Sequence, residues 1–370
     1  MPEGREIESI RLHYQTMVPV DDRPTNRATL AAVAKHAGVS ASTASLAFNN
    51  SGPVSSATRA RVLASATVLG YAGPDPRARS LRRGRSGIVG AVLEDTLRDA
   101  FRDPMNLLML DGIADVVGPA GNSLLLLTET SDSGSSLVDA PVDAVVLFGC
   151  STRVDEAVNV VLRRRIPVVS IEGRPLEGVL DVGLDNRSAT AFLARHLHNL
   201  GHGDVALVTL ELDRARTVGP LSPELVDGAT SFTAQERVRG AQEVYPAIGG
   251  RSTLGSSIEQ GLLAGRALLS DPATRPTAIL AQSDLLAVGV IRAARELGLD
   301  VPRDLSVVGF DGSRIDDPVA DGLTTMVQPA LDKGRAAGRG VLALLAGERP
   351  DPVTFTSTFR RGTTTAAPRA

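Results

Sequence analysis

Apolar positions near the start of the chain repeat every three or four residues, which predicts one face of a short helix. They are Leu30, Val33, Ala34 and Ala37. Gly38 follows, and glycine tolerates the positive φ at which a helix ends. Ser40 is a preferred N-cap for a second helix from Ala41 to Phe48. Two short helices joined by a tight turn predict a helix-turn-helix.

A third helix is predicted directly after this pair. Residues 49–53 contain Asn, Ser, Gly and Pro and indicate a loop, and Ser55 is a second N-cap candidate. From residue 57 to 69 the apolar side chains again fall on one face. They are Val62, Leu63, Ala66 and Leu69. Three short helices with apolar faces predict a small all-α head.

From residue 87 onward, continuously apolar runs alternate with helical patterns. The runs predict strands at 88–93, 123–127, 144–148, 166–171, 181–185, 205–209, 278–281 and 305–310, and the helical patterns lie at 107–117, 154–164, 188–200, 234–244, 258–269 and 284–297. Apolar strands separated by helices are typical of parallel sheets covered on both faces. The rhythm occurs twice, which predicts two α/β lobes behind the all-α head.

Charge distinguishes the head from the rest of the chain. Residues 28–87 hold eight basic residues and one acidic residue, a net charge of +7, whereas the whole chain carries −3. Basic side chains neutralise phosphates and release counterions, so a basic head favours a polyanionic partner. Because the charge coincides with the helix-turn-helix, we predict that the head binds double-stranded DNA.

Composition narrows the class of protein further. A 370-residue chain with 43% hydrophobic residues can form several buried cores, and its single cysteine excludes an internal disulfide framework or a cysteine zinc site. No apolar run approaches the roughly 20 residues that span a membrane. The first 26 residues lack the features of a signal peptide and are predicted to form a flexible tail. We therefore expect a cytoplasmic protein.

The residues that carry a family resemblance begin at Thr29. They read TLAAVAKHAGVSASTASLAFNNSGPVSSATRARVLASATVLGYAGPDPRARSLRRGRSGIVGAVLED. This run resembles the head of the LacI/GalR family of bacterial transcription regulators, and the similarity continues almost to the end of the chain. The resemblance implies a repressor that binds a palindromic operator as a homodimer. It also implies a periplasmic-binding-protein-like body that holds a small-molecule effector, a sugar or sugar derivative, between its lobes.

Domain boundaries follow from the pattern and the resemblance together. We expect a tail at 1–26, a DNA-binding domain at 27–73, a hinge helix and linker at 74–86, and an effector-binding and dimerisation domain at 87–370. Within the last, lobe 1 is expected at about 87–186 and 314–350, and lobe 2 at about 187–313 and 351–370. The family's tetramers use a leucine-rich C-terminal helix that residues 363–370 lack, so a dimer is expected.

Position by position, the resemblance assigns DNA contacts to the second helix and the residues after it. Base contacts fall to Ala41, Ser42 and Leu46, of which only Ser42 can donate or accept a hydrogen bond, whereas the other two can meet a thymine methyl. Phosphate or backbone contacts fall to Thr43, Ser45, Asn49 and Tyr71. Many family members have a polar residue at the position of Leu46, so packing within the head is an alternative for this side chain.

Residues 77–82 resemble the family's hinge helix. There a leucine from each subunit wedges into the central base step of the operator from the minor groove. The match is Leu81, with Ala78 packing beside it and Arg79 and Arg82 on the flanking DNA backbone. A segment this short is not a stable helix alone, so it is expected to fold when dimer and DNA are both present.

The resemblance also assigns effector contacts in the body. Arg237 matches the arginine that family members direct at the effector, and Asp311 matches the carboxylate on the other side. Further candidates are Asp284, which caps a helix beside the cleft, Arg174 in a Glu-Gly-Arg-Pro strand end, and the aromatic residues Phe101 and Phe310. Ligands in open α/β sheets bind beyond the carboxyl ends of the strands, where these residues lie. A structural ion pair is the alternative for Arg237 and Asp311.

Two other functions fit the sequence less well. An enzyme is disfavoured because the chain has no P-loop, no Gly-x-Ser-x-Gly motif and no cluster of its five histidines, and we expect no cofactor or metal. A transported-solute-binding protein would share the body but would need a signal peptide and no basic head. The long segment at 211–233 either covers the mouth of the pocket or forms a disordered loop.

Overall fold

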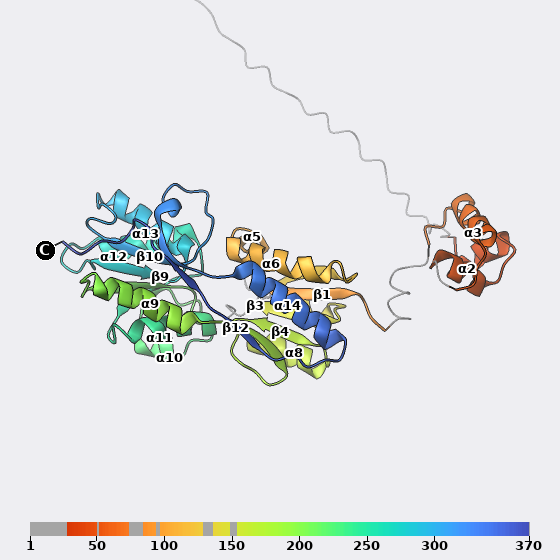
Figure 1. Cartoon of the computed structure of the whole chain (residues 1–370), viewed down its shortest axis with the longest axis horizontal. Coiled ribbons are helices and arrows are strands. Elements are labelled where there is room, and N and C mark those ends of the chain that lie inside the picture. The colour runs from red at the N-terminus through yellow and green to blue at the C-terminus, as the bar shows by residue number, and fades with distance from the viewer. Residues whose placement is uncertain are drawn as a thin grey trace, which may run out of the picture. The chain divides into compact units, whose positions relative to one another are not determined.

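The computed structural model describes residues 28–49, 52–73, 84–93, 97–128, 136–148 and 154–369 (Figure 1). Contacts within the chain divide it into two units, Met1–Arg83 and Gly84–Ala370. The predicted tail at 1–26 lies outside the described residues. Among the described residues, no helix has both the length and the apolar character that a membrane crossing requires.

The first unit contains the three predicted helices. They are α1 (Leu30–His36), α2 (Ala41–Phe48) and α3 (Ser56–Val68). Gly38 has a φ of 65°, which ends α1 as expected, and the Ser40 hydroxyl accepts a hydrogen bond from the Thr43 N–H at the start of α2. The buried core is made of small apolar side chains. They are Val33, Ala34, Ala37, Ala44, Ala47, Val62 and Ala66. Leu63, which was expected on this face, is 43% exposed.

In the second unit, lobe 1 is built on a parallel six-stranded sheet with the order β12-β5-β4-β3-β1-β2. Its strands are β1 (Ile88–Leu93), β2 (Ser123–Thr128), β3 (Ala144–Phe148), β4 (Val168–Ile171), β5 (Val179–Leu184) and β12 (Val353–Phe355). Its helices are α5 (Leu97–Ala100), α6 (Pro104–Val117), α7 (Ser136–Asp139), α8 (Val154–Arg163) and α14 (Ala330–Leu345). Helices α6 and α14 cover one face of this sheet and α8 covers the other (Figure 1).

Lobe 2 is built on a seven-stranded sheet with the order β13-β11-β10-β9-β6-β8-β7, in which only the edge strands β13 and β7 pair antiparallel. Its strands are β6 (Val205–Thr209), β7 (Gly219–Pro220), β8 (Gly249–Ser252), β9 (Ala278–Ala281), β10 (Ser306–Asp311), β11 (Thr324–Val327) and β13 (Thr358–Arg360). Its α-helices are α9 (Asn186–Asn199), α10 (Pro223–Asp227), α11 (Phe232–Gln242), α12 (Ile258–Leu269) and α13 (Asp284–Glu296), and a 3-10 turn, η1, spans Ala320–Gly322. An all-α head followed in the chain by two α/β lobes confirms the predicted fold class.

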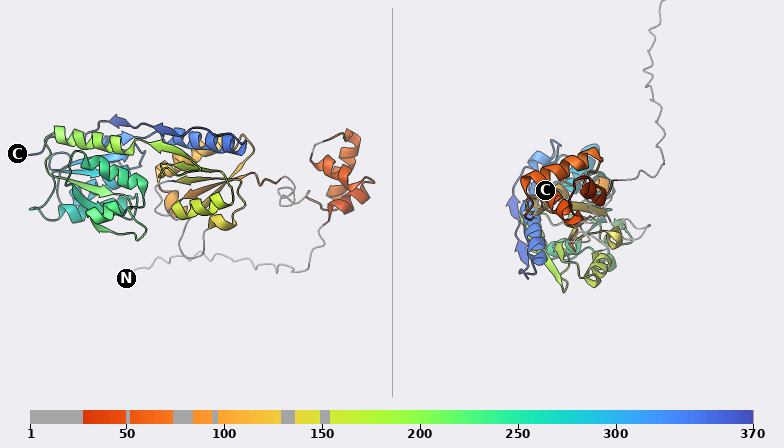
Figure 2. Two further views of the ribbon diagram at one scale, coloured as in Figure 1. Left: turned by 90° about the horizontal axis from the view of Figure 1, so that it is seen from below. Right: turned by 90° about the vertical axis from the view of Figure 1, so that its right-hand side faces the viewer.

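Two of the expected boundaries between the lobes, after residue 313 and after residue 350, are wrong. The chain does not leave lobe 2 near Ser313, because β11 continues that sheet by pairing with β10, with Asp311 opposite Val327. The crossing follows β11 instead. The last crossing is not near Pro350 either, since β12 still belongs to lobe 1 and β13 to lobe 2. Figure 2 shows this final extended segment running from one lobe to the other.

Helix α14 was not predicted, because its glycines interrupt the apolar pattern. The structure explains them through close packing against α6. A Cβ atom on Gly112 of α6 would lie 2.2 Å from the carbonyl oxygen of Leu331, and one on Gly334 of α14 would lie 2.2 Å from the carbonyl oxygen of Met109. The two helix backbones can approach this closely only without side chains at these positions. This contact fixes α6, whose N-terminal half reaches the space between the lobes.

The long segment at 211–233 is not a disordered loop. It contains β7, which pairs with β8 at the edge of the lobe 2 sheet, and α10, whose N-cap is Ser222. Asp213 accepts hydrogen bonds from the backbone and side chain of Thr217, which closes the turn before β7. The beginning of the segment, at Glu211, faces the cleft between the lobes.

Candidate DNA-binding helix and effector cleft

Helix α2 presents the side chains that the sequence assigns to base contacts. Ala41, Ser42 and Asn49 are exposed, whereas Ala44 and Ala47 on the opposite face are buried in the head. The Ser40 hydroxyl lies 2.8 Å from those of Ser42 and Thr43, so three hydroxyl groups cluster at the start of the helix. A helix with small exposed residues at its N-terminus can lie deep in a major groove and offer these hydroxyls to base edges.

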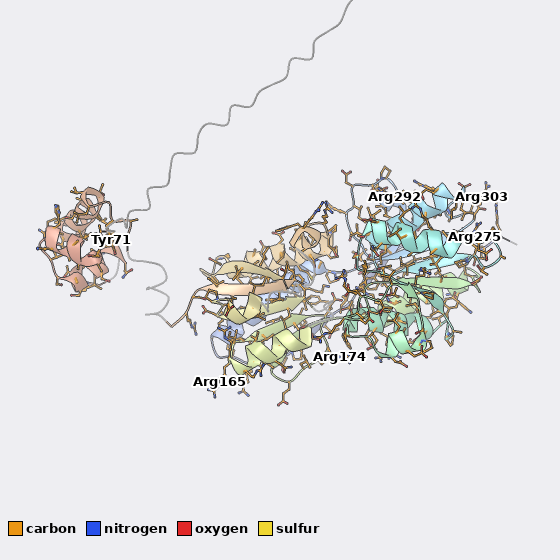
Figure 3. All side chains as sticks on the ribbon, turned by 180° about the vertical axis from the view of Figure 1, so that it is seen from behind. Tyr71, Arg165, Arg174, Arg275, Arg292 and Arg303 are labelled. Atoms are coloured by element: carbon orange, nitrogen blue, oxygen red, sulfur yellow. The ribbon has the colours of Figure 1, made fainter. Side chains whose placement is uncertain are left out.

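Two of the expected DNA contacts also take part in packing within the head. Leu46 is 36% exposed, and its side chain lies over the following loop, where a Cβ atom on Gly52 would be 3.1 Å from Leu46 Cδ2. Tyr71, labelled in Figure 3, packs edge-on against the Phe48 ring with 5.4 Å between ring centroids. Leu46 therefore has one face against the loop and one face towards solvent. Ser45 is half-buried, and its Oγ lies 3.5 Å from Asn49 Nδ2.

The hinge residues fall outside the described part of the chain. Ala78, Arg79, Leu81 and Arg82 all lie in the undescribed range 74–83, so the wedge assignment stays a prediction.

The body contains a cleft lined by both lobes. It encloses about 740 Å³ of space, part of it open to solvent. Lobe 1 contributes residues at the start of α6 and at the ends of β3 and β4. Lobe 2 contributes one residue of α11 and residues at or just after the ends of β6, β8, β9, β10 and β11. The lining comprises Asp103, Met105, Asn106, Met109, Phe148, Glu172, Leu210, Glu211, Arg237, Leu254, Gly255, Ser256, Ser283, Asp311 and Gln328. Most of these residues follow the carboxyl ends of strands, where ligands bind in such sheets.

Arg237 lies at the centre of the lobe 2 side. Its Nε donates to Asn186 Oδ1 at 2.8 Å, and its Nη1 donates to the carbonyl oxygen of Gln282. The guanidinium stacks over the Phe310 ring, 3.7 Å from its centroid. The side chain of Arg237 is thus held by several protein contacts while it lines the cleft.

Two carboxylates flank this guanidinium, one from each lobe. Arg237 Nη2 lies 3.8 Å from Glu172 Oε2, and Nη1 lies 3.7 Å from Asp311 Oδ1. Both acidic residues have positive φ, 59° for Glu172 and 115° for Asp311, although neither is a glycine. Such backbone strain persists where surrounding contacts hold the residue, and it concentrates at functional sites.

Glu172 takes part in a buried network of hydrogen bonds and ion pairs with residues of both lobes. Lys333, which is fully buried on α14, donates to Glu172 and to Gln328, and Asn186 Nδ2 donates to Glu172 Oε2 at 2.7 Å. Burial opposes ionisation of Glu172. The charges of Lys333 and Arg237, together with the hydrogen bonds, outweigh it and hold its pKa below the ordinary value. Glu172 is therefore an ionised carboxylate.

The two buried aspartates of lobe 2 behave in the opposite way. Burial raises the pKa of Asp311 well above its ordinary value, Arg237 partly offsets this, and the charges of Asp284 and Asp103 add to it. Burial also raises the pKa of Asp284 to about 7, although Thr325 and the Ser313 N–H donate to its carboxylate. Asp284 therefore does not line the cleft. Its hydrogen bond from Thr325 connects the start of α13 to β11.

The six effector candidates therefore separate into three groups. Arg237 and Asp311 line the cleft. Phe310 is buried, and its ring stacks against the Arg237 guanidinium. Asp284, Arg174 and Phe101 are not among the lining residues. Arg174, labelled in Figure 3, is exposed with its Cζ atom 5.5 Å from the centroid of Phe232, and Phe101 is 54% exposed. At this strand end it is Glu172 that lines the cleft, whereas Arg174, two residues later, is exposed.

Sequence reasoning missed the lobe 1 side of the cleft. Asp103, Met105, Asn106 and Met109 come from the start of α6 rather than from a strand end, so the strand-end rule did not find them. Lys333 was detectable in principle, since it is one of two lysines in a chain with 37 arginines. Among the described residues, no group of three or more His, Cys, Asp or Glu side chains is arranged to hold a metal ion.

Comparison with known proteins agrees with this architecture. Residues 29–73 match the family of bacterial regulatory proteins of the lacI type, and residues 194–364 match the periplasmic-binding-protein-like domain. A helix-turn-helix-type transcriptional regulator of Mycobacterium tuberculosis is 37% identical over 333 residues, 86% of this chain and 91% of that protein.

Solved structures show the same fold. A LacI-family transcriptional regulator from Corynebacterium glutamicum is 29% identical and has a TM-score of 0.68 over 91% of this chain and 98% of that one. The lac repressor dimer bound to operator and an anti-inducer is 23% identical, with a TM-score of 0.70 over 92% of this chain and 100% of that one, a likeness of fold alone. The family match of the head and the identity to a full-length relative show that this chain belongs to the LacI family of bacterial regulatory proteins, which are helix-turn-helix transcription regulators.

Proposed function

We propose that this chain is a homodimeric repressor that binds a palindromic operator and is controlled by a small-molecule effector in the cleft between its lobes. The observation that carries the proposal is the pairing of an exposed, hydroxyl-bearing helix α2 in a basic head with a cleft in the body that side chains of both lobes line. The lac repressor structure, a dimer on its operator, has the same fold and is the model for this assembly. We infer that the protein acts in the cytoplasm, where it reaches DNA, and has no catalytic role.

The cleft is suited to control because it is lined by both lobes. Arg237 and Asp311 belong to lobe 2, Glu172 and Asp103 belong to lobe 1, and an effector that contacts both sets favours one arrangement of the lobes. A ligand shifts such an equilibrium only through its different affinities for the two arrangements. The strained backbone of Glu172 and Asp311, one at a strand end in each lobe, supports a role for this site in binding. We propose a sugar or sugar derivative as the effector.

Selection of bound sites from random or genomic DNA with the purified protein tests the DNA half of the proposal. We expect a palindrome of two half-sites around a central pyrimidine-purine step, because such steps are easily kinked. Failure to enrich any sequence, with and without added small molecules, would contradict the assignment of the head.

Leu81→Ala tests the proposed wedge. We expect specific operator binding to weaken by about 100-fold, roughly 2.7 kcal/mol, because the inserted side chain acts only on kinked DNA. Binding to non-specific DNA, which depends on phosphate contacts, should change less than about threefold. Fluorescence anisotropy with both DNAs measures this, and equal losses on the two DNAs would remove the wedge from the proposal.

A further inference from the structure

A second pocket lies on lobe 2, between α12 and the sheet edge formed by β7 and β8. It encloses about 280 Å³, part of it open to solvent, and none of its described lining residues lines the cleft between the lobes. The polar lining side chains are Arg251, Ser252, Thr253 and Gln260, and the apolar ones are Val218, Leu263 and Ala264. The volume is close to the lower end of the range for ligand pockets, so a ligand here has to be small.

Three separate parts of the chain build the walls of this pocket. Arg251 and Ser252 belong to β8, Gln260 and Leu263 belong to α12, and Val218 directly precedes β7. The two-residue strand β7 pairs antiparallel with β8, which fixes the position of Val218 at the edge of the pocket. The long segment before α11 therefore supplies one wall.

Arg251 is the one charged side chain among the described lining residues. It is half-buried, and its guanidinium has no hydrogen-bond or ion-pair partner in the described part of the chain. Other arginines of lobe 2 are paired with acids, Arg216 with Glu211 and Arg266 with Glu296. A guanidinium presents several donors in one plane, which matches the two oxygens of a carboxylate. An unpaired guanidinium at the wall of a pocket therefore favours an anionic group.

Two further donors without partners line the same pocket. Ser252 is 1% exposed, yet its Oγ has no hydrogen-bond partner among the described residues. Buried hydroxyl groups are nearly always hydrogen-bonded, so an unpaired one at a pocket indicates a place for a ligand or a water molecule. Gln260 accepts the Leu254 N–H at 3.1 Å through Oε1, which leaves its Nε2 without a protein partner in the described ranges. A guanidinium, a hydroxyl and an amide can thus donate to one anion.

The apolar wall narrows the class of ligand. Val218 is 53% exposed and Leu263 is 51% exposed, although both are large apolar side chains. Covering them removes apolar surface from water, which favours a ligand with an aliphatic part. A phosphate group with two negative charges fits less well, since the described lining offers a single cation.

We propose that this pocket is a second ligand site, distinct from the cleft, and that it binds a small monocarboxylate with a short aliphatic chain. The carboxylate accepts hydrogen bonds from the Arg251 guanidinium, the Ser252 hydroxyl and the Gln260 amide. The aliphatic chain covers Val218 and Leu263.

The pocket and the cleft share one stretch of backbone. Strand β8 and the residues after it line the pocket up to Thr253 and line the cleft from Leu254 to Ser256. Gln260 holds the Leu254 N–H, and the Thr253 hydroxyl accepts the Gly255 N–H at 3.3 Å. A monocarboxylate that fixes this stretch restrains one wall of the cleft, which gives the two sites a route for coupling.

Titration of the full-length protein with butyrate tests the site, with binding followed by the NMR line widths of the ligand. We expect butyrate to bind about fivefold more tightly than acetate, because two more methylene groups are partly buried. Butyramide, which has the same shape without the charge, should bind at least about tenfold more weakly than butyrate. Equal affinities of butyrate and butyramide overturn the proposal, and so does displacement of butyrate by an equal concentration of inorganic phosphate. These measurements need neither operator nor effector, so their outcome is independent of the proposed regulatory function.

Arg251→Gln tests the contact with the carboxylate. It removes the charge and keeps a long polar side chain, and we expect the affinity for butyrate to fall at least about tenfold. The matched control is Arg195→Gln, at an exposed position of α9 outside both linings, which should change the affinity less than about twofold. Equal losses in the two variants would show that butyrate binds through surface charge alone and would overturn the site.

Leu263→Gln tests the apolar wall and does not depend on the folding of the Arg251 variant. The position is half-exposed on α12, and glutamine is a good helix former. We expect butyrate to lose about threefold in affinity and acetate to change less than about twofold, because only the longer chain reaches this wall. Equal losses for both ligands would contradict the placement of the aliphatic chain.

Labelling of the leucines with ¹⁵N locates the bound ligand. The amide signal of Leu254, identified with a Leu254→Met variant, should shift on addition of butyrate, because Gln260 accepts this N–H. The same signal should stay fixed in Arg251→Gln. A Leu254 signal that does not move at saturating butyrate would place the ligand elsewhere and overturn the site.

Discussion

Each lobe brings one buried cation to the region of the cleft, and the two differ in what surrounds them. Lys333 of lobe 1 is fully buried, and its contacts are protein side chains, Glu172 and Gln328. Arg237 of lobe 2 is 3% exposed but lines the cleft, stacked on Phe310 between carboxylates of both lobes. We propose that Lys333 stabilises the network around Glu172, whereas Arg237 contacts a ligand in the cleft.

The same difference assigns distinct roles to the two partners of these cations. Glu172 is ionised because Lys333 and Arg237 overcome its burial, so it is a fixed acceptor. Asp311 has one nearby cation and two acidic neighbours, and its pKa is raised. The lobe 1 carboxylate is thus compensated by two cations, whereas Arg237 only partly offsets the burial of the lobe 2 carboxylate.

Lys333→Met should give the largest effect. Removing one partner of a buried ion pair leaves an uncompensated charge, so we expect the free energy of unfolding to fall by about 3 kcal/mol or more. Urea denaturation followed by circular dichroism measures this loss.

The control for Lys333→Met is Arg335→Met on the same helix, whose ion pair with Asp115 is 39% and 47% exposed. It should cost less than about 1 kcal/mol. The double variant Lys333→Met/Glu172→Gln should recover more than half of the loss, because the unpaired charge is gone. A double variant as unstable as Lys333→Met alone would assign the loss to packing.

Arg237→Ala should act on effector response more than on folding. We expect stability to fall by about 2 kcal/mol, because Glu172 keeps Lys333 and Asp311 can become protonated. Operator affinity without effector should stay within about threefold, while a small molecule that changes the operator affinity of the unsubstituted protein no longer changes it.

The matched control is Arg239→Ala, since Arg239 lies on the same helix and pairs with Glu236 at an exposed position. It should leave the response intact. An Arg237→Ala protein that still responds normally would show that the effector binds elsewhere.

Asp181→Asn should give the smallest effect and a dependence on pH. Asp181 lies on β5, and burial, followed by the charge of Glu172, raises its pKa to about 6. Because the folded state has the higher pKa, its contribution to stability is fully present below about pH 4 and is lost as pH rises through 6.

Replacing Asp181 should therefore raise the free energy of unfolding by about 1 kcal/mol at pH 8 and change it little at pH 4.5. The value at pH 8 is reduced because this side chain is partly exposed. Melting temperatures at the two pH values measure the difference. Asp139→Asn, at an exposed position of α7, should shift both equally. A pH-independent shift for Asp181→Asn would place its origin in packing rather than in ionisation.

Much of the fold was predictable from local patterns. Strands β3, β6 and β9 and helices α2 and α12 begin and end where the apolar pattern places them, because their buried faces are continuous in sequence. The N-caps Ser40 and Ser55 were also predictable, because each hydroxyl accepts a hydrogen bond from an N–H only three residues further along the chain. Helix α14 was missed, because Gly334 and Gly338 are explained only by the surface of α6 against which they pack.

The candidate site shows the same division. The sequence by itself determined the helix-turn-helix head, the two α/β lobes, the family, and the placement of Arg237 and Asp311 at the cleft, because these depend on short patterns and on motifs contiguous in sequence. Only the tertiary structure decided that Asp103 faces Asp311, that Lys333 neutralises Glu172 and that Asp284 lies behind the cleft. The partners in those contacts are 29 to 208 residues apart. Whether a buried group is ionised, and whether its charge is compensated, depends on neighbours in space, and local sequence carries no record of them.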